Sequence, residues 1–378
     1  MKRLLLISDP LGGSESVQLE LLLTVAKTLQ REYRLTLFTP YCDPEKAELI
    51  RGADLTLLVP SNHDFVLNRG LQRVGQRNEA MLWAESWTRE TLFRSNERDA
   101  RRTIGDSTFD RVLNMSSTVV YPCDLWWIQG TPLDITIAGM ARTNWAASVA
   151  DTMARPLIRW FDQRLARRAE AVSGQIVASS PFLMDLYRSR HVNVNGVIYS
   201  VKDLAPFQPS SARPSRDYVL TYVGKEIERL DFRALKAAGV RVVGFGGKIP
   251  TGTQLRRFTD CIDFRGFVSR RELVDLYSNA LFTLFPFSTE ALGYVPLESM
   301  ACGTPVLTYD RQGPGETVVD GRTGWLVQSG DEMVRKAKEL WHRGITDISS
   351  EECIRRANVF SLHRSAAELM SRIERSPR

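Results

Sequence analysis

Residues 285–306 read FPFSTEALGYVPLESMACGTPV, and this stretch decides the fold class of the chain. It begins within a short apolar run, residues 280–287, which is typical of a buried strand. Pro296 predicts the first turn of a helix, where its missing amide hydrogen costs nothing, and Gly303 predicts the end of that helix. Residues 306–309 then form the next predicted strand. A strand, loop, helix and strand in this order indicate an α/β unit with a parallel sheet.

Two carboxylates, Glu290 and Glu298, lie in the loop and the helix of this stretch. The loop follows the carboxyl end of a strand, where open α/β sheets bind ligands, and its backbone amides suit a phosphate or a sugar hydroxyl. Taken singly, Glu298 is explained as an acid that stabilises its helix start, and Glu290 as a solvated loop residue. Taken together, they predict a sugar-nucleotide site.

Short apolar runs alternate with helical patterns along the rest of the chain, which predicts two doubly wound parallel sheets. The Pro- and Ser-rich residues 204–216 indicate a linker between an N-terminal domain, residues 1–203, and a C-terminal domain, residues 217–359. The predicted strands are residues 4–8, 33–38, 55–59, 111–114 and 174–178 in the first domain, and 218–223, 241–245, 262–265, 281–285, 306–309 and 324–327 in the second.

Glu290 and Glu298 stand eight positions apart, and the residues around them resemble the signature of glycosyltransferase family 4, a GT-B group. The resemblance implies an α/β fold of two Rossmann-like domains that face a central cleft. It also implies that the last helix, within residues 360–378, packs back onto the N-terminal domain. In this family the first glutamate contacts the donor sugar and the second contacts the ribose, so the resemblance assigns these roles to Glu290 and Glu298.

The resemblance also assigns the remaining donor contacts. Gly224 ends a predicted strand, and the cations Lys225 and Arg229 behind it would stabilise the negative charge of a departing diphosphate. A surface position on the next helix is the other interpretation of Arg229. Simple turn formation is the alternative for the glycines. The other donor-binding candidates are Gly12, Gly13, Gly246, Phe267, Val268, Leu292, Gly293 and Tyr294.

The sequence offers fewer candidate residues for contacts with the acceptor. Residues 126–131 read WWIQGT and lack the histidine that many family members carry near the acceptor. Trp127 and Gln129 are the candidates for acceptor contacts, although adjacent tryptophans suit a core or a cleft wall equally well. Retaining transfer does without a protein base, because the departing phosphate oxygen takes the acceptor's proton on the same face.

The resemblance therefore implies a retaining glycosyltransferase. It would move a sugar from a nucleotide-diphosphate donor to a hydroxyl of a glycan, a lipid-linked molecule or a small molecule. The alternative is a non-catalytic GT-B protein that binds a nucleotide or glycan or serves as a partner subunit. The missing histidine and Ala291, where the family signature usually has glycine, motivate that alternative.

Composition agrees with a soluble globular protein, since 43% of the 378 residues are hydrophobic and 25% are charged. The odd number of cysteines without close pairs indicates a reduced, cytoplasmic protein. No stretch approaches the about 20 apolar residues of a membrane helix. Five scattered cysteines predict neither a zinc site nor a disulfide framework. The chain has no Asp-x-Asp triplet, so we expect no metal and no cofactor besides the nucleotide sugar as co-substrate.

The net charge of +6 has one notable concentration, in residues 153–171. Five arginines alternate there with apolar residues at helical spacing, which is typical of a helix that lies on anionic lipid. This interpretation places a peripheral contact at the inner face of a membrane. An ordinary amphipathic helix with solvated arginines is the alternative. Without a nucleic-acid-binding motif, we expect no nucleic-acid partner. The sequence does not specify an oligomeric state.

Overall fold

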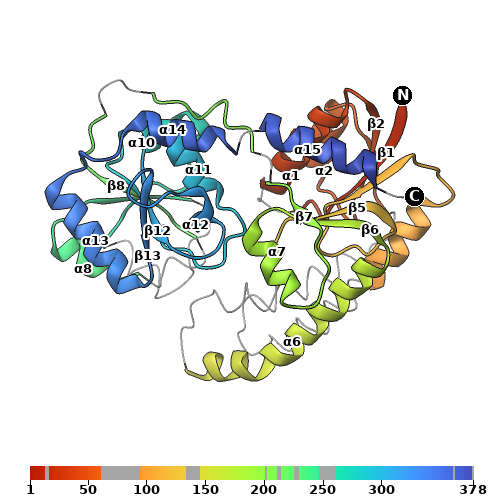
Figure 1. Cartoon of the computed structure of the whole chain (residues 1–378), viewed down its shortest axis with the longest axis horizontal. Helices are drawn as coiled ribbons and strands as arrows, with labels where there is room; N and C mark the ends of the chain where they lie inside the picture. The colour runs from red at the N-terminus through yellow and green to blue at the C-terminus, as the bar shows by residue number, and fades with distance from the viewer. Residues whose placement is uncertain are drawn as a thin grey trace. The chain divides into compact units, whose positions relative to one another are not determined.

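The computed structural model describes residues 1–12, 17–60, 94–132, 145–200, 202–210, 214–224, 230–246, 260–360 and 362–376. The chain divides into two compact units (Figure 1). Unit 1 comprises Met1–Ala138, Arg142–Val201 and Leu362–Arg378, and unit 2 consists mainly of Lys202–Ser361. Each unit has its own parallel sheet with flanking helices, which is the doubly wound α/β architecture.

Unit 1 contains a seven-stranded sheet in the order β3-β2-β1-β4-β5-β6-β7. The five strands predicted for this part of the chain are confirmed, and β5 and β7 are additional. The strands are β1 (Lys2–Ile7), β2 (Tyr33–Phe38), β3 (Thr56–Leu58), β4 (Arg111–Asn114), β5 (Cys123–Ile128), β6 (Ser173–Ala178) and β7 (Gly196–Val197). The helices with defined ends are α1 (Val17–Leu29), α2 (Pro44–Gly52), α6 (Trp145–Ala171), α7 (Pro181–Arg188) and α15 (Leu362–Arg375).

Unit 2 contains a six-stranded sheet in the order β10-β9-β8-β11-β12-β13, and all six strands were predicted. They are β8 (Val219–Tyr222), β9 (Val242–Phe245), β10 (Asp263–Phe264), β11 (Thr283–Phe285), β12 (Val306–Tyr309) and β13 (Gly324–Val327). The helices with defined ends are α8 (Phe232–Ala237), α10 (Arg270–Asn279), α11 (Tyr294–Ala301), α12 (Pro314–Thr317), α13 (Gly330–Arg343) and α14 (Ser350–Asn358).

The strand order reverses once in each sheet, and this switch point predicts where a ligand binds. In unit 1 the reversal lies between β1 and β4, and in unit 2 it lies between β8 and β11. All strand pairs recorded in the two sheets are parallel, so the carboxyl ends of each sheet share one edge. Open α/β sheets bind ligands at that edge beside the switch point.

The last helix of the chain is part of unit 1. Leu369 and Ile373 of α15 are buried in the same hydrophobic cluster as Leu4 and Leu6 of β1. The guanidinium of Arg111 donates to the backbone oxygen of Glu374 at 3.0 Å, which ties the end of α15 to β4. The chain therefore crosses from unit 2 back to unit 1 before it ends.

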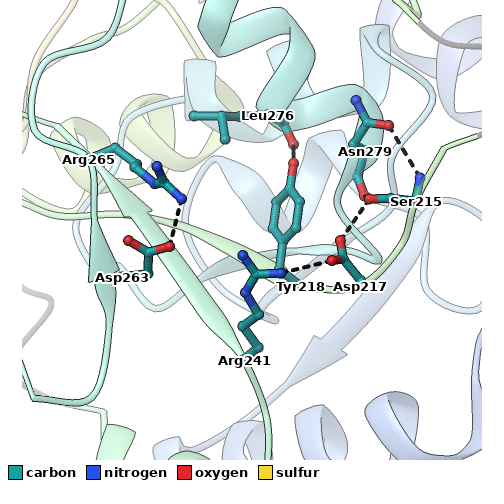
Figure 2. Close-up of polar contacts among 8 residues, drawn as sticks. All are labelled: Ser215, Asp217, Tyr218, Arg241, Asp263, Arg265, Leu276 and Asn279. Carbon is teal, nitrogen blue, oxygen red and sulfur yellow. Dashed lines mark hydrogen bonds and ion pairs between the residues drawn. The ribbon is translucent and has the colours of Figure 1, made fainter.

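A polar network holds the amino ends of β8 and β9 together (Figure 2). The carboxylate of Asp217 accepts hydrogen bonds from Ser215 Oγ at 2.7 Å and from the Arg241 guanidinium at 2.8 Å. The bond from Ser215 lowers the pKa of the Asp217 carboxyl. Asn279 accepts from the Ser215 amide at 3.2 Å. These groups lie at the edge opposite the carboxyl ends, and we assign them a structural role.

Candidate functional site

The carboxyl ends of β8 and β9 meet around the ring of Tyr222, which the sequence analysis did not single out. Its ring centroid lies 5.5 Å from that of Phe245 and 5.7 Å from that of Phe287. A Cβ atom at Gly224 would lie 2.6 Å from the Tyr222 ring, and one at Gly246 would lie 2.7 Å from the carbonyl oxygen of Val223. Close packing around Tyr222 therefore requires glycine at both positions, with or without a ligand.

Glu290 lies in the loop that follows β11, at the switch point of unit 2. Burial raises the pKa of Tyr222, and the negative charge of Glu290 raises it further, so the carboxylate of Glu290 lies near this ring. Glu290 is half-buried. Glu290 and Gly224 both follow strands of the unit 2 sheet at its carboxyl edge, Glu290 after β11 and Gly224 after β8.

Gln312 braces the Glu290 loop, and the sequence analysis missed it. Its side-chain oxygen accepts a hydrogen bond from the Glu290 amide at 2.6 Å, and its side-chain nitrogen donates to the backbone oxygen of Phe287. The side chain is buried, and the backbone has a φ of 66°, which is uncommon for a residue other than glycine. The amide of the next residue, Gly313, donates a hydrogen bond to the backbone oxygen of Glu290 at 3.1 Å. Two consecutive residues after β12 therefore fix the loop.

Glycines allow the loop and helix α11 to pack this closely. A Cβ atom on Gly313 would lie 2.2 Å from the carbonyl oxygen of Ala291. Gly293 has a φ of 85° and precedes the first residue of α11. The helix begins at Tyr294, so Pro296 lies in its first turn as predicted, although the helix starts two residues before this proline. The positive φ of Gly293 sets the start.

Glu298 is buried in unit 2 and held by two side chains. It is 7% exposed. Its Oε1 atom lies 3.0 Å from Lys202 Nζ, and its Oε2 atom accepts a hydrogen bond from the Tyr277 hydroxyl at 2.9 Å. No acid lies in the first turn of α11, so the interpretation of Glu298 as an acid at the helix start is wrong.

Lys202 is the counter-ion that the sequence analysis did not identify, because it lies beside the predicted linker. Its side chain is as buried as that of Glu298, and each is 9% exposed. The ammonium lies 5.6 Å from the ring centroid of Phe207 and 5.3 Å from that of Tyr294, both suitable cation–π distances. Burial and the nearby Glu298 carboxylate raise the pKa of Tyr277, which therefore stays a neutral hydrogen-bond donor.

The other predicted donor residues differ in exposure. Leu292 is buried, whereas Val268 and Tyr294 are half-buried. Phe267 is 76% exposed, and its ring is open to solvent. Gly13, Lys225 and Arg229 lie outside the described residues.

Asp9 organises the switch point of unit 1, close in sequence to Gly12. Its carboxylate accepts hydrogen bonds from the amides of Ser117 and Thr118, the latter at 2.9 Å. It also accepts from three hydroxyls, those of Ser116, Ser117 and Thr118. Asp9 therefore joins the loop after β1 to the loop after β4. No sequence motif marked it.

The two acceptor-side candidates lie differently in unit 1. Trp127 is fully buried in the hydrophobic cluster of unit 1, and its indole nitrogen donates to the backbone oxygen of Ile198 at 2.9 Å. Trp127 is therefore a core residue, which is one of the two alternatives given for the adjacent tryptophans. Its side chain is not exposed to an acceptor. Gln129 follows β5 and accepts from Ser200 Oγ at 2.9 Å. Its side-chain nitrogen is buried and has no hydrogen-bond partner among the described residues.

The described ranges contain neither a candidate metal centre nor a candidate membrane-spanning helix. No group of three or more His, Cys, Asp or Glu side chains in this part of the chain could hold a metal ion. None of the helices found there has the length and apolarity needed to cross a membrane.

Comparison with known proteins identifies the part of the chain that carries this site. Residues 253–358 match the family model of glycosyl transferases group 1. The matched segment lies within unit 2, which is similar to the glycosyl transferases group 1 family there. The matched segment includes Glu290, Glu298 and Gln312, and it begins after Gly224 and Gly246.

Curated relatives carry the description D-inositol 3-phosphate glycosyltransferase. The protein from Streptosporangium roseum is 29% identical over 280 residues, which cover 64% of this chain and 63% of the relative. The protein from Mycolicibacterium smegmatis is 28% identical over 213 residues, which cover 50% of this chain and 48% of the relative. The chain thus spans about half to two-thirds of the length of these relatives.

Several solved structures share the fold of the whole chain. HepE from Anabaena, solved with UDP and glucose, matches with a TM-score of 0.60 at 14% identity, covering 99% of this chain and 100% of that one. Sucrose-phosphate synthase from Thermosynechococcus elongatus matches with a TM-score of 0.60 at 17% identity, covering 98% of each chain. These matches confirm the predicted GT-B fold class.

Proposed function

We propose that the protein is a retaining glycosyltransferase that moves a sugar from a nucleotide-diphosphate donor to the hydroxyl of a glycan, a lipid-linked molecule or a small molecule. The position of Glu290 carries this proposal. It lies at the switch point of unit 2, in a loop that Gln312 fixes, within the segment that matches glycosyl transferases group 1. The UDP-bound and UDP-glucose-bound structures of HepE, which has the same fold, support a nucleotide sugar as the donor.

The roles of the individual residues follow the family resemblance. Glu290 would hold the donor sugar, and Lys225 and Arg229 would stabilise the diphosphate as it departs. The bond between the anomeric carbon and the diphosphate oxygen breaks, and a bond to the acceptor oxygen forms on the same face. The acceptor's proton passes to the departing phosphate oxygen. Gly12 and Gly13 of unit 1 are proposed donor contacts as well.

We propose that Glu298 binds ribose hydroxyls through its carboxylate, as the family resemblance implies. Lys202 and Tyr277 approach different oxygens of this carboxylate. We propose that these two contacts fix its orientation.

The protein would work in the cytoplasm with the nucleotide sugar as its co-substrate and without a metal. All five cysteines are free thiols, which supports a reducing compartment. The proposed cations, Lys225 and Arg229, would do the work that a metal does in other enzymes that handle diphosphates.

Release of nucleoside diphosphate from a panel of nucleotide sugars tests the proposal. We expect release with at least one donor. We expect Glu290→Gln to reduce turnover by at least about ten-fold, because it removes a hydrogen bond to a charged group. The matched control is Glu339→Gln, because Glu339 pairs with Lys336 on the surface of unit 2. Tight nucleotide binding without release from any donor would favour the non-catalytic binding protein. Absence of nucleotide binding would contradict both functions.

A further inference from the structure

Helix α6 has an outward face that the candidate site does not use. The helix has 27 residues, which corresponds to about 40 Å at the usual rise per residue. Its inner side is buried in unit 1 through Ile158, Phe161, Ala166 and Ala169. In Figure 1 its C-terminal end lies beside β6, and its N-terminal part continues beyond the sheet of unit 1.

Among the side chains described between residues 152 and 171, the exposed face is basic and carries no exposed acid. The exposed side chains described between residues 152 and 171 belong to Thr152, Met153, Arg155, Pro156, Arg159, Trp160, Arg164, Arg167 and Ala171. Neither of the two acids described in this range, Asp162 and Glu170, is exposed. Asp162 is buried, and Glu170 is half-buried and accepts a hydrogen bond from the Asn193 amide at 2.8 Å. Arg168, which is not fully exposed, is paired with Glu97.

Two large apolar side chains lie on the same face. Met153 is 64% exposed and Trp160 is 51% exposed. Met153, Trp160 and Arg167 follow each other at seven-residue spacing, which places them on one line along the helix. The guanidinium carbon of Arg164 lies 5.5 Å from the Trp160 ring centroid. The face thus combines an exposed indole with guanidinium groups.

We propose that this face of α6 binds the headgroup region of an anionic lipid bilayer. Guanidinium groups suit lipid phosphates, and a Trp ring suits the boundary between headgroups and acyl chains. Met153 and Trp160 supply too little apolar surface for deep insertion, so the attraction is mainly electrostatic and falls with salt. The exposed indole and thioether favour a lipid surface over a nucleic acid. This inference does not rest on the proposed function.

Vesicle co-sedimentation of the full chain tests the proposal, using phosphatidylcholine vesicles with and without phosphatidylglycerol. We expect binding only to the anionic vesicles, strongest at low ionic strength. Each arginine near the surface contributes about five-fold to partitioning, so Arg164→Gln with Arg167→Gln should weaken binding by about an order of magnitude or more. The matched control, Arg31→Gln with Arg51→Gln, removes the same charge from other exposed positions of unit 1 and should retain binding.

Trp160 separates interfacial contact from simple charge attraction. Trp160→Ala should weaken binding several-fold at unchanged net charge, and Trp160→Phe should retain most of it. Circular dichroism checks that each variant is folded, which we expect because the substituted side chains are exposed. The proposal is overturned if anionic vesicles do not bind at low salt, or if both arginine pairs weaken binding equally. It is also overturned if duplex DNA binds through Arg164 and Arg167 while vesicles do not.

Discussion

Replacing Lys202 with methionine should destabilise unit 2 by several kcal/mol. The Lys202 ammonium and the Glu298 carboxylate lie 3.0 Å apart, and each side chain is 9% exposed. At an effective dielectric constant of about 20, the Coulomb attraction at this distance is about 5 kcal/mol. Removing one partner of a buried pair typically costs about 3–5 kcal/mol, because the other charge stays buried without compensation. We therefore expect Lys202→Met and Glu298→Gln each to lower the unfolding free energy by about 3–5 kcal/mol.

The double variant distinguishes a charge pair from two separate packing defects. When Lys202→Met and Glu298→Gln are combined, neither charge is left unpaired. The loss of unfolding free energy should then be at least about 2 kcal/mol smaller than the sum of the single losses. Urea denaturation of the four proteins measures this coupling. The surface pair Lys336 and Glu339 is the matched control, with substitutions expected to cost no more than about 0.5 kcal/mol each.

Two results would refute this reasoning about Lys202. Single losses equal to those of the surface pair would mean that the buried charges do not attract each other strongly. Additive losses would mean that the substitutions act independently. A nucleotide-binding measurement well below the melting temperature separates stability from function. Glu298→Gln should weaken nucleotide binding there, since it removes a carboxylate proposed to bind ribose.

Three further predictions concern the loop brace, a crowded glycine and the thiols. Gln312→Ala leaves the Glu290 amide and the Phe287 backbone oxygen without their partner. We therefore expect the unfolding free energy, measured by urea denaturation, to fall by about 2–4 kcal/mol, and donor turnover to fall as well. Unchanged values would contradict the role of Gln312 in fixing the Glu290 loop. Gly313→Ala should prevent folding or abolish turnover, because its Cβ would meet Ala291. Gly321 has a φ of 70° and open space around it, so Gly321→Ala should lower the unfolding free energy by only about 1–2 kcal/mol. Equal melting temperatures of the two variants would contradict this contrast. Burial raises the pKa of three thiols to about 12, so these thiols stay protonated at pH 8 and should resist alkylation in the native protein. The two half-buried thiols should react first. Mass spectrometry after alkylation measures this, and rapid labelling of all five cysteines would contradict the burial of the three. The protected thiols are those of Cys123, Cys302 and Cys353.

Local sequence patterns predicted most of the fold because buried parallel strands are short apolar runs. Strand β5 was missed because Asp124 interrupts its apolar run and the tryptophan pair suggested a site. The structure accommodates Asp124 through partners on β4. Its carboxylate accepts from the Arg111 guanidinium at 2.8 Å and from the Val112 amide at 2.7 Å. Contacts of this kind override local propensity and are not visible along the sequence.

The residues of the candidate site that lie in one local motif were predictable from the sequence. Those that reach the site through contacts between distant parts of the chain were not. The spacing of Glu290 and Glu298 lies within one strand–loop–helix unit. Gln312 contacts the loop from 22 positions away, and nothing in its local sequence distinguishes it from a turn residue. Lys202 and Asp9 act on partners still further along the chain. Lys202 lies next to a Pro- and Ser-rich stretch, which indicates a linker rather than a buried charge.

A donor-bound crystal structure tests the central claim most directly, with the nucleotide sugar that the release assay selects. The account predicts the diphosphate beside Gly224 at the carboxyl ends of β8 and β11, the sugar against the Glu290 loop, and a ribose hydroxyl within hydrogen-bonding distance of Glu298. A nucleotide bound away from the switch point of unit 2, or bound there without contact to either glutamate, would contradict it.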